Sequence, residues 1–244
     1  MMKRRKETAG PLPQGKERNR MKRTKIKDRQ LPVYSRGEEI FNMVSHIVGG
    51  SFAIFATIAC CWRAAMHQNG LGVVAGLVFG LTMLLLYTMS SVYHGLTGKG
   101  TGKKVMQVLD HCTIFLLIAG TYTPITLLGI RPANPLAGWG LFALVWVSAV
   151  VGISLNGVDL RKFRVFSMTC YLCSGWCVML AAGLLTQVMP MPGFYLLLGG
   201  GVAYTIGAVL YGVGSKRKWM HCIFHLFVIV GSVLHFLCIF LYLM

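Results

Sequence analysis

The C-terminal stretch from Lys218 to Met244 decides the fold. It begins Trp219-Met220-His221-Cys222-Ile223-Phe224-His225 and continues to the end of the chain without an Asp, Glu, Lys or Arg. A helix of about 20 apolar residues, rising about 1.5 Å per residue, is long enough to cross a bilayer. This stretch is therefore predicted to be a transmembrane helix, although it also carries imidazoles at positions 221, 225 and 235. Ionisable groups inside a membrane span are costly, and by default they mark a functional site.

The whole chain has the composition of an integral membrane protein. Of its 244 residues 55% are hydrophobic and 13% charged, and the mean hydropathy is +0.62, whereas a soluble domain carries about 25% charged residues. The net charge of +17 does not indicate nucleic acid, because 13 of the 24 Lys and Arg residues lie in the first 36 positions, without aromatic interleaving or a nucleic-acid-binding motif. A basic segment beside a span is attracted to anionic lipid headgroups. We expect membrane lipids as partners, anionic headgroups at the N-terminal tail, and no nucleic acid.

Apolar runs predict seven transmembrane helices and thus an all-α, polytopic membrane fold. Residues 1–37 precede these runs, are rich in Lys and Arg, and are expected to form a disordered tail ahead of a membrane domain at 38–244. In the second run Gly72, Gly76 and Gly80 form a seam of small residues that would let another helix approach closely. The predicted spans are 41–63, 71–94, 109–130, 136–155, 164–188, 193–213 and 220–243.

The positive charges predict the orientation in the membrane. The tail and the loops after the second, fourth and sixth runs hold 22 of the 24 Lys and Arg residues, among them Lys99 and Lys216. The other three loops contribute only Arg63 and Arg131. The positive-inside rule then places the N-terminus in the cytoplasm, and an odd number of spans places the C-terminus outside. The expected location is the plasma membrane of the cell.

Polar residues from distant runs are predicted to meet at the cytoplasmic end of this bundle. His94 ends the second run, and Asp110, the only acidic residue in any predicted span, lies in the first turn of the third. His221 and His225 begin the seventh run on one helix face, and His46 lies at the same level near the start of the first. A lone buried carboxylate protonates unless it is paired or lies near a cation. A metal ion bound by the histidines would be that cation.

Three imidazoles with one open coordination position are typical of catalytic zinc, which generates hydroxide at neutral pH. Asp110 would then hold the reacting water as a base, or be a ligand itself. Ser90, one helical turn before His94, would hydrogen-bond to the site or stabilise an oxyanion. Two alternatives stay open: Ser90 could bond to its own backbone, and each histidine could be a hydrogen-bonding group between helices.

Five motifs are distributed between residue 38 and the C-terminus. They are Glu38-Glu39-x-x-Asn42-x-x-x-His46, Ser90-Ser91-Val92-Tyr93-His94, Leu109-Asp110-His111, Gly120-Thr121-Tyr122-Thr123-Pro124, and His221-x-x-x-His225 with Gly231-Ser232-x-x-His235-Phe236. In these motifs the chain resembles the hemolysin III family, within the progestin and adipoQ receptor (PAQR) superfamily. The resemblance implies a zinc ion held by His94, His221 and His225, with Asp110 near its water. Asn42 and His46, typical of the hemolysin-like branch, would complete or replace a ligand, and His235 is an additional candidate.

The resemblance also implies kinship with integral-membrane lipid hydrolases such as alkaline ceramidases. The expected function is therefore that of a zinc-dependent hydrolase of a lipid amide or ester, or of a regulator of membrane lipid homeostasis. One alternative is a cytolytic, pore-forming hemolysin, the activity for which the family is named. A second is a non-catalytic, receptor-like membrane protein in which the metal only ties helices together.

Overall fold

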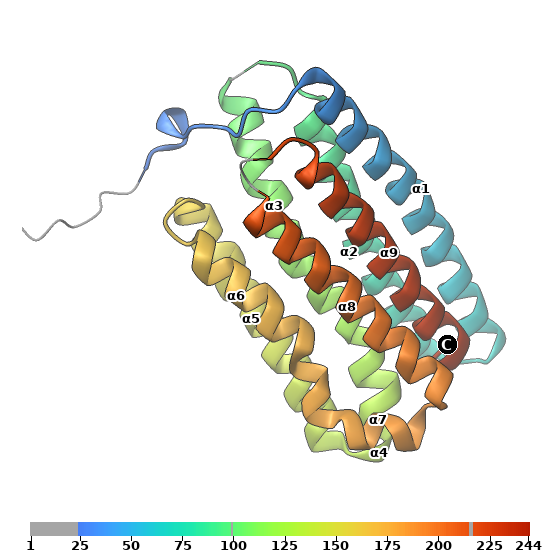
Figure 1. Cartoon of the computed structure of the whole chain (residues 1–244). Coiled ribbons are helices and arrows are strands. Elements are labelled where there is room, and N and C mark those ends of the chain that lie inside the picture. The colour runs from blue at the N-terminus through green and yellow to red at the C-terminus, as the bar shows by residue number, and fades with distance from the viewer. Residues whose placement is uncertain (1–23, 99, 215–216) are drawn as a thin grey trace, which may run out of the picture.

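The computed structural model describes residues 24–98, 100–214 and 217–244, and all regular structure within these ranges is helical (Figure 1). Seven helical spans in the described ranges are long and apolar enough to cross a membrane, so the predicted all-α, multi-pass fold is confirmed. Lys99, Lys216 and most of the expected tail lie outside the described residues. The seven spans are Arg36–Met66 (α1), Gly70–Gly95 (α2), Thr101–Ala133, Pro135–Asp159 (α5), Arg164–Val188, Met191–Val213 (α8) and Met220–Tyr242 (α9).

The third span changes its helical geometry at Pro124. Proline has no backbone N–H, and its ring clashes with the carbonyl four residues earlier, so the regular helix ends there and a π-helical turn follows. The hydroxyl of Thr126 donates to the carbonyl of Tyr122 at 2.8 Å across this change. The consecutive segments of the span are α3 (Thr101–Pro124), η2 (Ile125–Ile130) and α4 (Arg131–Ala133).

The fifth span is interrupted by a short 3₁₀ segment, and Tyr122 of the third span bridges the interruption. Its hydroxyl donates to the carbonyl of Gly175 at 2.8 Å and accepts from the backbone N–H of Val178 at 3.0 Å. Backbone groups left without a helical partner are thus satisfied inside the bundle, as a membrane interior requires. The consecutive segments are α6 (Arg164–Trp176), η3 (Cys177–Ala181) and α7 (Ala182–Val188).

The predicted glycine seam lies where α2 packs on α1. A Cβ at Gly80 would lie 1.9 Å from the hydroxyl of Thr57, and one at Gly76 would lie 3.2 Å from the Cβ of Cys60. The missing side chains therefore let the two helices approach more closely than larger residues would allow. This packing fixes α1, and with it the residues of its first turns, against the end of α2.

Two helices begin earlier than the hydropathy pattern predicted. Helix α1 begins at Arg36 rather than 41, because Ser35 and Glu38 form a reciprocal capping box, and this places Glu38 and Glu39 in its first turn. Helix α3 begins at Thr101 rather than 109, so Asp110 lies well inside it. The predictions that Asp110 occupies a first turn and is the only acidic residue in a span were therefore wrong. Hydropathy missed these helical turns because they are polar.

The expected boundary between tail and membrane domain also differs from the structure. Residues 24–35 were expected to be disordered, but they run across one end of the bundle and contact it (Figure 1). The backbone N–H of Thr24 donates to the carboxylate of Asp159 at 2.8 Å, and the guanidinium of Arg29 donates to the carbonyl of Val158 at 3.2 Å. This segment, which includes the short turn η1 (Ile26–Asp28), lies at the end where α1 begins and α2 ends.

Candidate metal centre

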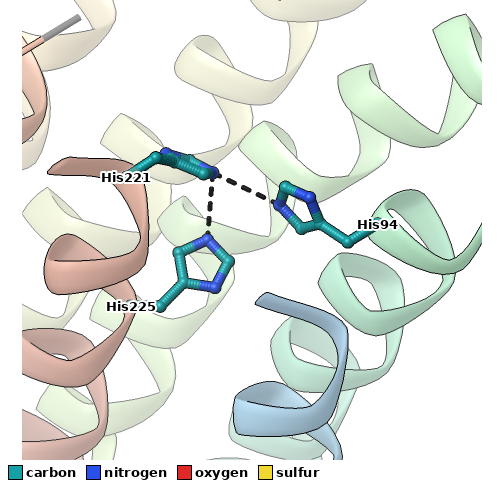
Figure 2. Close-up of side chains that lie close together, drawn as sticks. All are labelled: His94, His221 and His225. Atoms are coloured by element: carbon teal, nitrogen blue, oxygen red, sulfur yellow. Dashed lines mark hydrogen bonds between the residues drawn. The ribbon is translucent and has the colours of Figure 1, made fainter. Parts of the chain in front are cut away.

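Three histidines from two helices converge at this end of the bundle. Figure 2 shows His221 between His94, from the last turns of α2, and His225, one turn further along α9. The Nε2 atom of His221 lies 3.2 Å from Nε2 of His94 and 3.0 Å from Nε2 of His225. One ligand atom of each residue lies within 4.8 Å of the other two. The structure therefore has the convergence of helices two and seven that the sequence predicted.

The arrangement of these nitrogens fits a metal ion. Zinc binds imidazole nitrogen at about 2.0–2.1 Å, and tetrahedral angles then separate two ligand nitrogens by about 3.3 Å, close to the two distances found. A metal-binding imidazole is neutral, with a lone pair on one nitrogen and a hydrogen on the other. Without an ion, Nε2 of His221 can donate a hydrogen bond to one of the other two nitrogens, so the predicted alternative of a hydrogen bond between helices also fits these distances. The donor set of three imidazoles is one that zinc accepts.

Glu39 fixes which nitrogen of His94 faces the other two histidines. Its Oε2 atom lies 2.6 Å from Nδ1 of His94, and its Oε1 atom accepts from Lys103 Nζ at 2.6 Å. An ionised carboxylate only accepts, so Nδ1 of His94 carries the hydrogen, and in a neutral ring Nε2 then presents a lone pair. A carboxylate bound to the second ring nitrogen is typical of metal-ligating histidine. Glu39 was not predicted to take part in the site, because it lies outside the predicted first span.

Glu38 connects the beginnings of α1 and α9, and so positions His221. Its Oε1 atom accepts from the backbone N–H of Trp219 at 2.6 Å, and its Oε2 atom accepts from the backbone N–H of Ser35 at 2.8 Å. Trp219 adopts a left-handed backbone conformation, with φ of 66°, which is unusual for a bulky residue. The hydrogen bond from Glu38 holds this turn two residues before the first histidine of α9.

Tyr34 covers the outer side of the histidine cluster. Its ring stacks on that of His221, with ring centres 5.0 Å apart and planes at 16°, and lies 5.7 Å from the ring of His94. Burial raises the pKa of Tyr34 far above its ordinary value, so its hydroxyl stays protonated. No periodic pattern marked Tyr34, because it lies in the basic segment ahead of the first span.

A cavity of about 510 Å³ borders the histidine cluster on the side of α9. Its lining includes His221 and His225 together with Ser90 and Asp110, two residues that the sequence analysis assigned to catalysis. Most of the remaining lining within the bundle is apolar, and includes Leu86, Ile114, Leu117, Ile118, Phe224 and Val228. The cavity thus combines candidate metal ligands with space for an apolar chain.

Ser90 and Asp110 differ in how they are placed in this cavity. The Ser90 hydroxyl is buried and makes no hydrogen bond within the described part of the chain, so the alternative of a bond to its own backbone is not found. Asp110 is 9% exposed, and its Oδ2 atom lies 3.7 Å from Nδ1 of His111. Asp110 is not part of the group of three converging ligands. The structure therefore does not support direct ligation by Asp110, and its role as a base stays a prediction.

The three additional candidates are not part of the convergent group either. His46 stacks on His225, with ring centres 3.8 Å apart, and neither of its ring nitrogens has a hydrogen-bond partner in residues 24–98, 100–214 and 217–244. Asn42 is fully buried, and its side-chain amide likewise has no partner in these ranges. His235 lies about 15 Å along α9 from His225, at about 1.5 Å per residue, and its Nε2 atom lies 3.1 Å from the carbonyl oxygen of Leu197. His235 therefore cannot share an ion with the other histidines.

Comparison with known proteins identifies relatives over most of the chain. The family model described as haemolysin-III related matches residues 34–236. The chain is 38% identical over 205 residues to Hemolysin-3 of Bacillus cereus, and this alignment covers 84% of the chain and 91% of the relative. It is 36% identical to the Hemolysin-3 homolog of Bacillus subtilis (strain 168), in an alignment that covers 84% of the chain and 94% of that relative. The human monocyte to macrophage differentiation factor is 27% identical over 173 residues, covering 68% of this chain and 69% of that protein.

Proposed function

The chain belongs to the haemolysin-III-related family of multi-pass membrane proteins, and on this premise we propose that it is a zinc-dependent hydrolase of an amide or ester bond in a membrane lipid. The family expected from the motifs is confirmed, and the human relative is a protein of the PAQR type. One observation carries the proposal. Two of the three convergent imidazoles, those of His221 and His225, line the same largely apolar cavity as the Ser90 hydroxyl and the Asp110 carboxylate.

His94, His221 and His225 are the proposed zinc ligands, with Glu39 orienting His94. Zinc held by three imidazoles supplies Lewis acidity and, at neutral pH, a hydroxide nucleophile. Tyr34 also lines the cavity, and its ring stacks on His221. It would therefore shield this histidine from bulk water.

Asp110 and Ser90 have separate roles in this proposal. The carboxylate of Asp110 accepts the proton that the attacking water loses, and then passes this proton to the leaving amine or alcohol. The free hydroxyl of Ser90 donates a hydrogen bond to the carbonyl oxygen of the scissile bond, where negative charge develops. A buried hydroxyl without a partner supports this role, because unpaired buried polar groups are costly unless a ligand satisfies them.

The distribution of positive charge supports a position at the cytoplasmic face. Under the positive-inside rule the end of the bundle that holds the histidines faces the cytoplasm, and the substrate would come from the inner leaflet of the plasma membrane. The beginning of α1 and the C-terminus lie at opposite ends of the bundle (Figure 1), as an odd number of crossings requires.

The experiment combines metal analysis with a lipid screen on the detergent-purified protein. We expect about one zinc per chain and release of a fatty acid from at least one membrane lipid. Asp110→Asn should abolish hydrolysis while keeping the zinc, and His225→Ala should lose both. If zinc is bound but no lipid is hydrolysed, and if cells that carry Asp110→Asn keep the lipid composition of cells with the original protein, the metal is structural and the protein is receptor-like.

The same preparation tests the cytolytic alternative. A resident hydrolase should leave dye-loaded liposomes intact when the purified protein is added at low dose. Dye release that does not need zinc would contradict the proposal and favour a pore-forming hemolysin.

A further inference from the structure

Four arginines from three separate parts of the chain line the cavity at the end where the histidines lie. Arg29 comes from the segment ahead of α1, and Arg217 from the connection between α8 and α9. Arg161 lies in the turn between α5 and α6, and Arg164 is the first residue of α6. Figure 1 shows these segments at the same end of the bundle. We propose that these residues, here called the arginine cluster, bind the phosphate group of an amphiphilic ligand whose apolar part occupies the cavity.

Arg29 is the main support for the proposal. It is 6% exposed, and its Nη2 atom donates to the carbonyl of Val158, but its buried Nε and Nη1 atoms have no hydrogen-bond partner among the described residues. Donors of a buried guanidinium that lack an acceptor are costly, so an acceptor from a ligand is expected. The carboxylate of Asp159 already accepts from the backbone N–H groups of Thr24, Arg161 and Lys162.

The charge of the cavity lining favours an anion. Two carboxylates, Asp28 and Asp110, line the cavity with the arginine cluster, so the arginines are in excess. The guanidinium of Arg164 lies over the ring of Tyr211, 5.7 Å from its centre, which holds it at the cavity wall. Guanidinium groups match phosphate oxygens with paired hydrogen bonds. A phosphate has enough oxygens to bond to several guanidiniums at once, whereas a carboxylate has two.

The rest of the cavity suits an acyl chain. Beyond the arginine cluster the lining passes His221 and His225 and continues along apolar side chains of α3 and α9, among them Ile114, Leu117 and Val228. A phosphate-bearing lipid held at the arginine cluster would lie with its chain along these side chains and its linking bonds near the histidines. A phosphate-binding arginine cluster would name the substrate class of the proposed hydrolase. Cleavage of such a lipid rests on the proposed function, whereas its binding does not.

The test measures binding to the full-length protein in a neutral detergent. The probes are dioctanoyl phosphatidic acid, dioctanoylglycerol, which lacks the phosphate, and glycerol 3-phosphate, which lacks the chains. We expect phosphatidic acid to bind about tenfold or more tightly than dioctanoylglycerol, and Arg161→Gln and Arg164→Gln each to reduce its affinity by about tenfold. Both arginines are exposed and should tolerate glutamine, so loss of fold should not obscure the result.

Lys162→Gln is the matched control. Lys162 lies in the same turn and is also exposed, but it does not line the cavity and instead approaches the ring of Phe163. Its loss removes the same charge and should change the affinity by less than about twofold. Equal losses in Lys162→Gln and Arg164→Gln, or equal affinity for dioctanoylglycerol and phosphatidic acid, would overturn the arginine cluster as a phosphate site.

Two further comparisons identify the source of the phosphate and separate this inference from the hydrolase proposal. If glycerol 3-phosphate binds as tightly as phosphatidic acid, and both need Arg164, the ligand is a soluble phosphate ester rather than a lipid. Binding of phosphatidic acid that persists after zinc is removed, with no hydrolysis of any lipid, would contradict only the hydrolase. Hydrolysis of neutral lipids with no phosphate preference would contradict only the arginine cluster.

Discussion

Replacement of Glu39 tests whether this carboxylate orients His94 for metal binding. The contact between Oε2 of Glu39 and Nδ1 of His94 measures 2.6 Å, short as expected of a charge-assisted hydrogen bond. The side chain of Glu39 is only 19% exposed and that of His94 is fully buried, so water cannot fully replace the contact. Removing a partner of this kind lowers metal affinity by about 10–100-fold, which corresponds to a loss of about 1.4–2.7 kcal/mol in the free energy of metal binding.

The two substitutions at this position should differ in size. Glu39→Gln keeps an oxygen that accepts from Nδ1 and loses only the charge, so we expect zinc affinity to fall by about tenfold. Glu39→Ala removes the acceptor as well and leaves the carbonyl of Leu96 as the acceptor for Lys103, so the loss of zinc affinity should approach about 100-fold. Competition for zinc against a chelator of known affinity, on the purified protein in detergent, measures both.

Asp28→Asn is the control for net charge, because Asp28 is exposed and lies at the same end of the bundle. It should leave zinc affinity within about twofold of the original. Zinc affinities of Glu39→Gln and Glu39→Ala that both match the original would refute the assigned orientation of His94. A loss in Asp28→Asn as large as that in Glu39→Gln would show that the effect is one of overall charge.

Three other outcomes follow from the structure. His225→Ala should abolish zinc binding, whereas His235→Ala, on the same helix but about 15 Å away, should keep about one zinc per chain by elemental analysis. Gly80→Ala should reduce the free energy of unfolding by about 1–3 kcal/mol, and so lower the melting temperature, because the new Cβ would lie 1.9 Å from the hydroxyl of Thr57. Gly140→Ala in α5 should leave the melting temperature unchanged, because its new Cβ would have no atom within 4 Å. Equal melting temperatures of the two variants would contradict the α1–α2 packing. Removing zinc with a chelator should lower the melting temperature of the original protein and leave that of His225→Ala unchanged.

The sequence was sufficient for the fold class and for the three convergent histidines. Seven long apolar runs have one stable arrangement in a bilayer, because every backbone polar group must be satisfied inside its own helix. The parity of the crossings then places the end of α2 and the beginning of α9 at one depth. For this reason His94, His221 and His225 could be grouped without knowing how the helices pack.

The partners of these histidines could not be predicted in the same way. Glu39, Lys103 and Tyr34 lie in polar turns and in the segment before α1, where hydropathy gives no signal, and their contacts depend on how α1, α3 and the basic segment meet. The sequence also grouped His46 and His235 with the metal site, although one stacks behind His225 and the other lies deep in the bundle.

The lengths of the apolar runs and the distribution of positive charge both report position along the membrane normal. The sequence by itself therefore determined how many helices cross the membrane and at which depth each polar residue lies. The direction of each side chain within that level depends on helix rotation and close packing, which only the tertiary structure decided. The carboxylate on His94, the free hydroxyl of Ser90 and the buried guanidinium of Arg29 all belong to this second class.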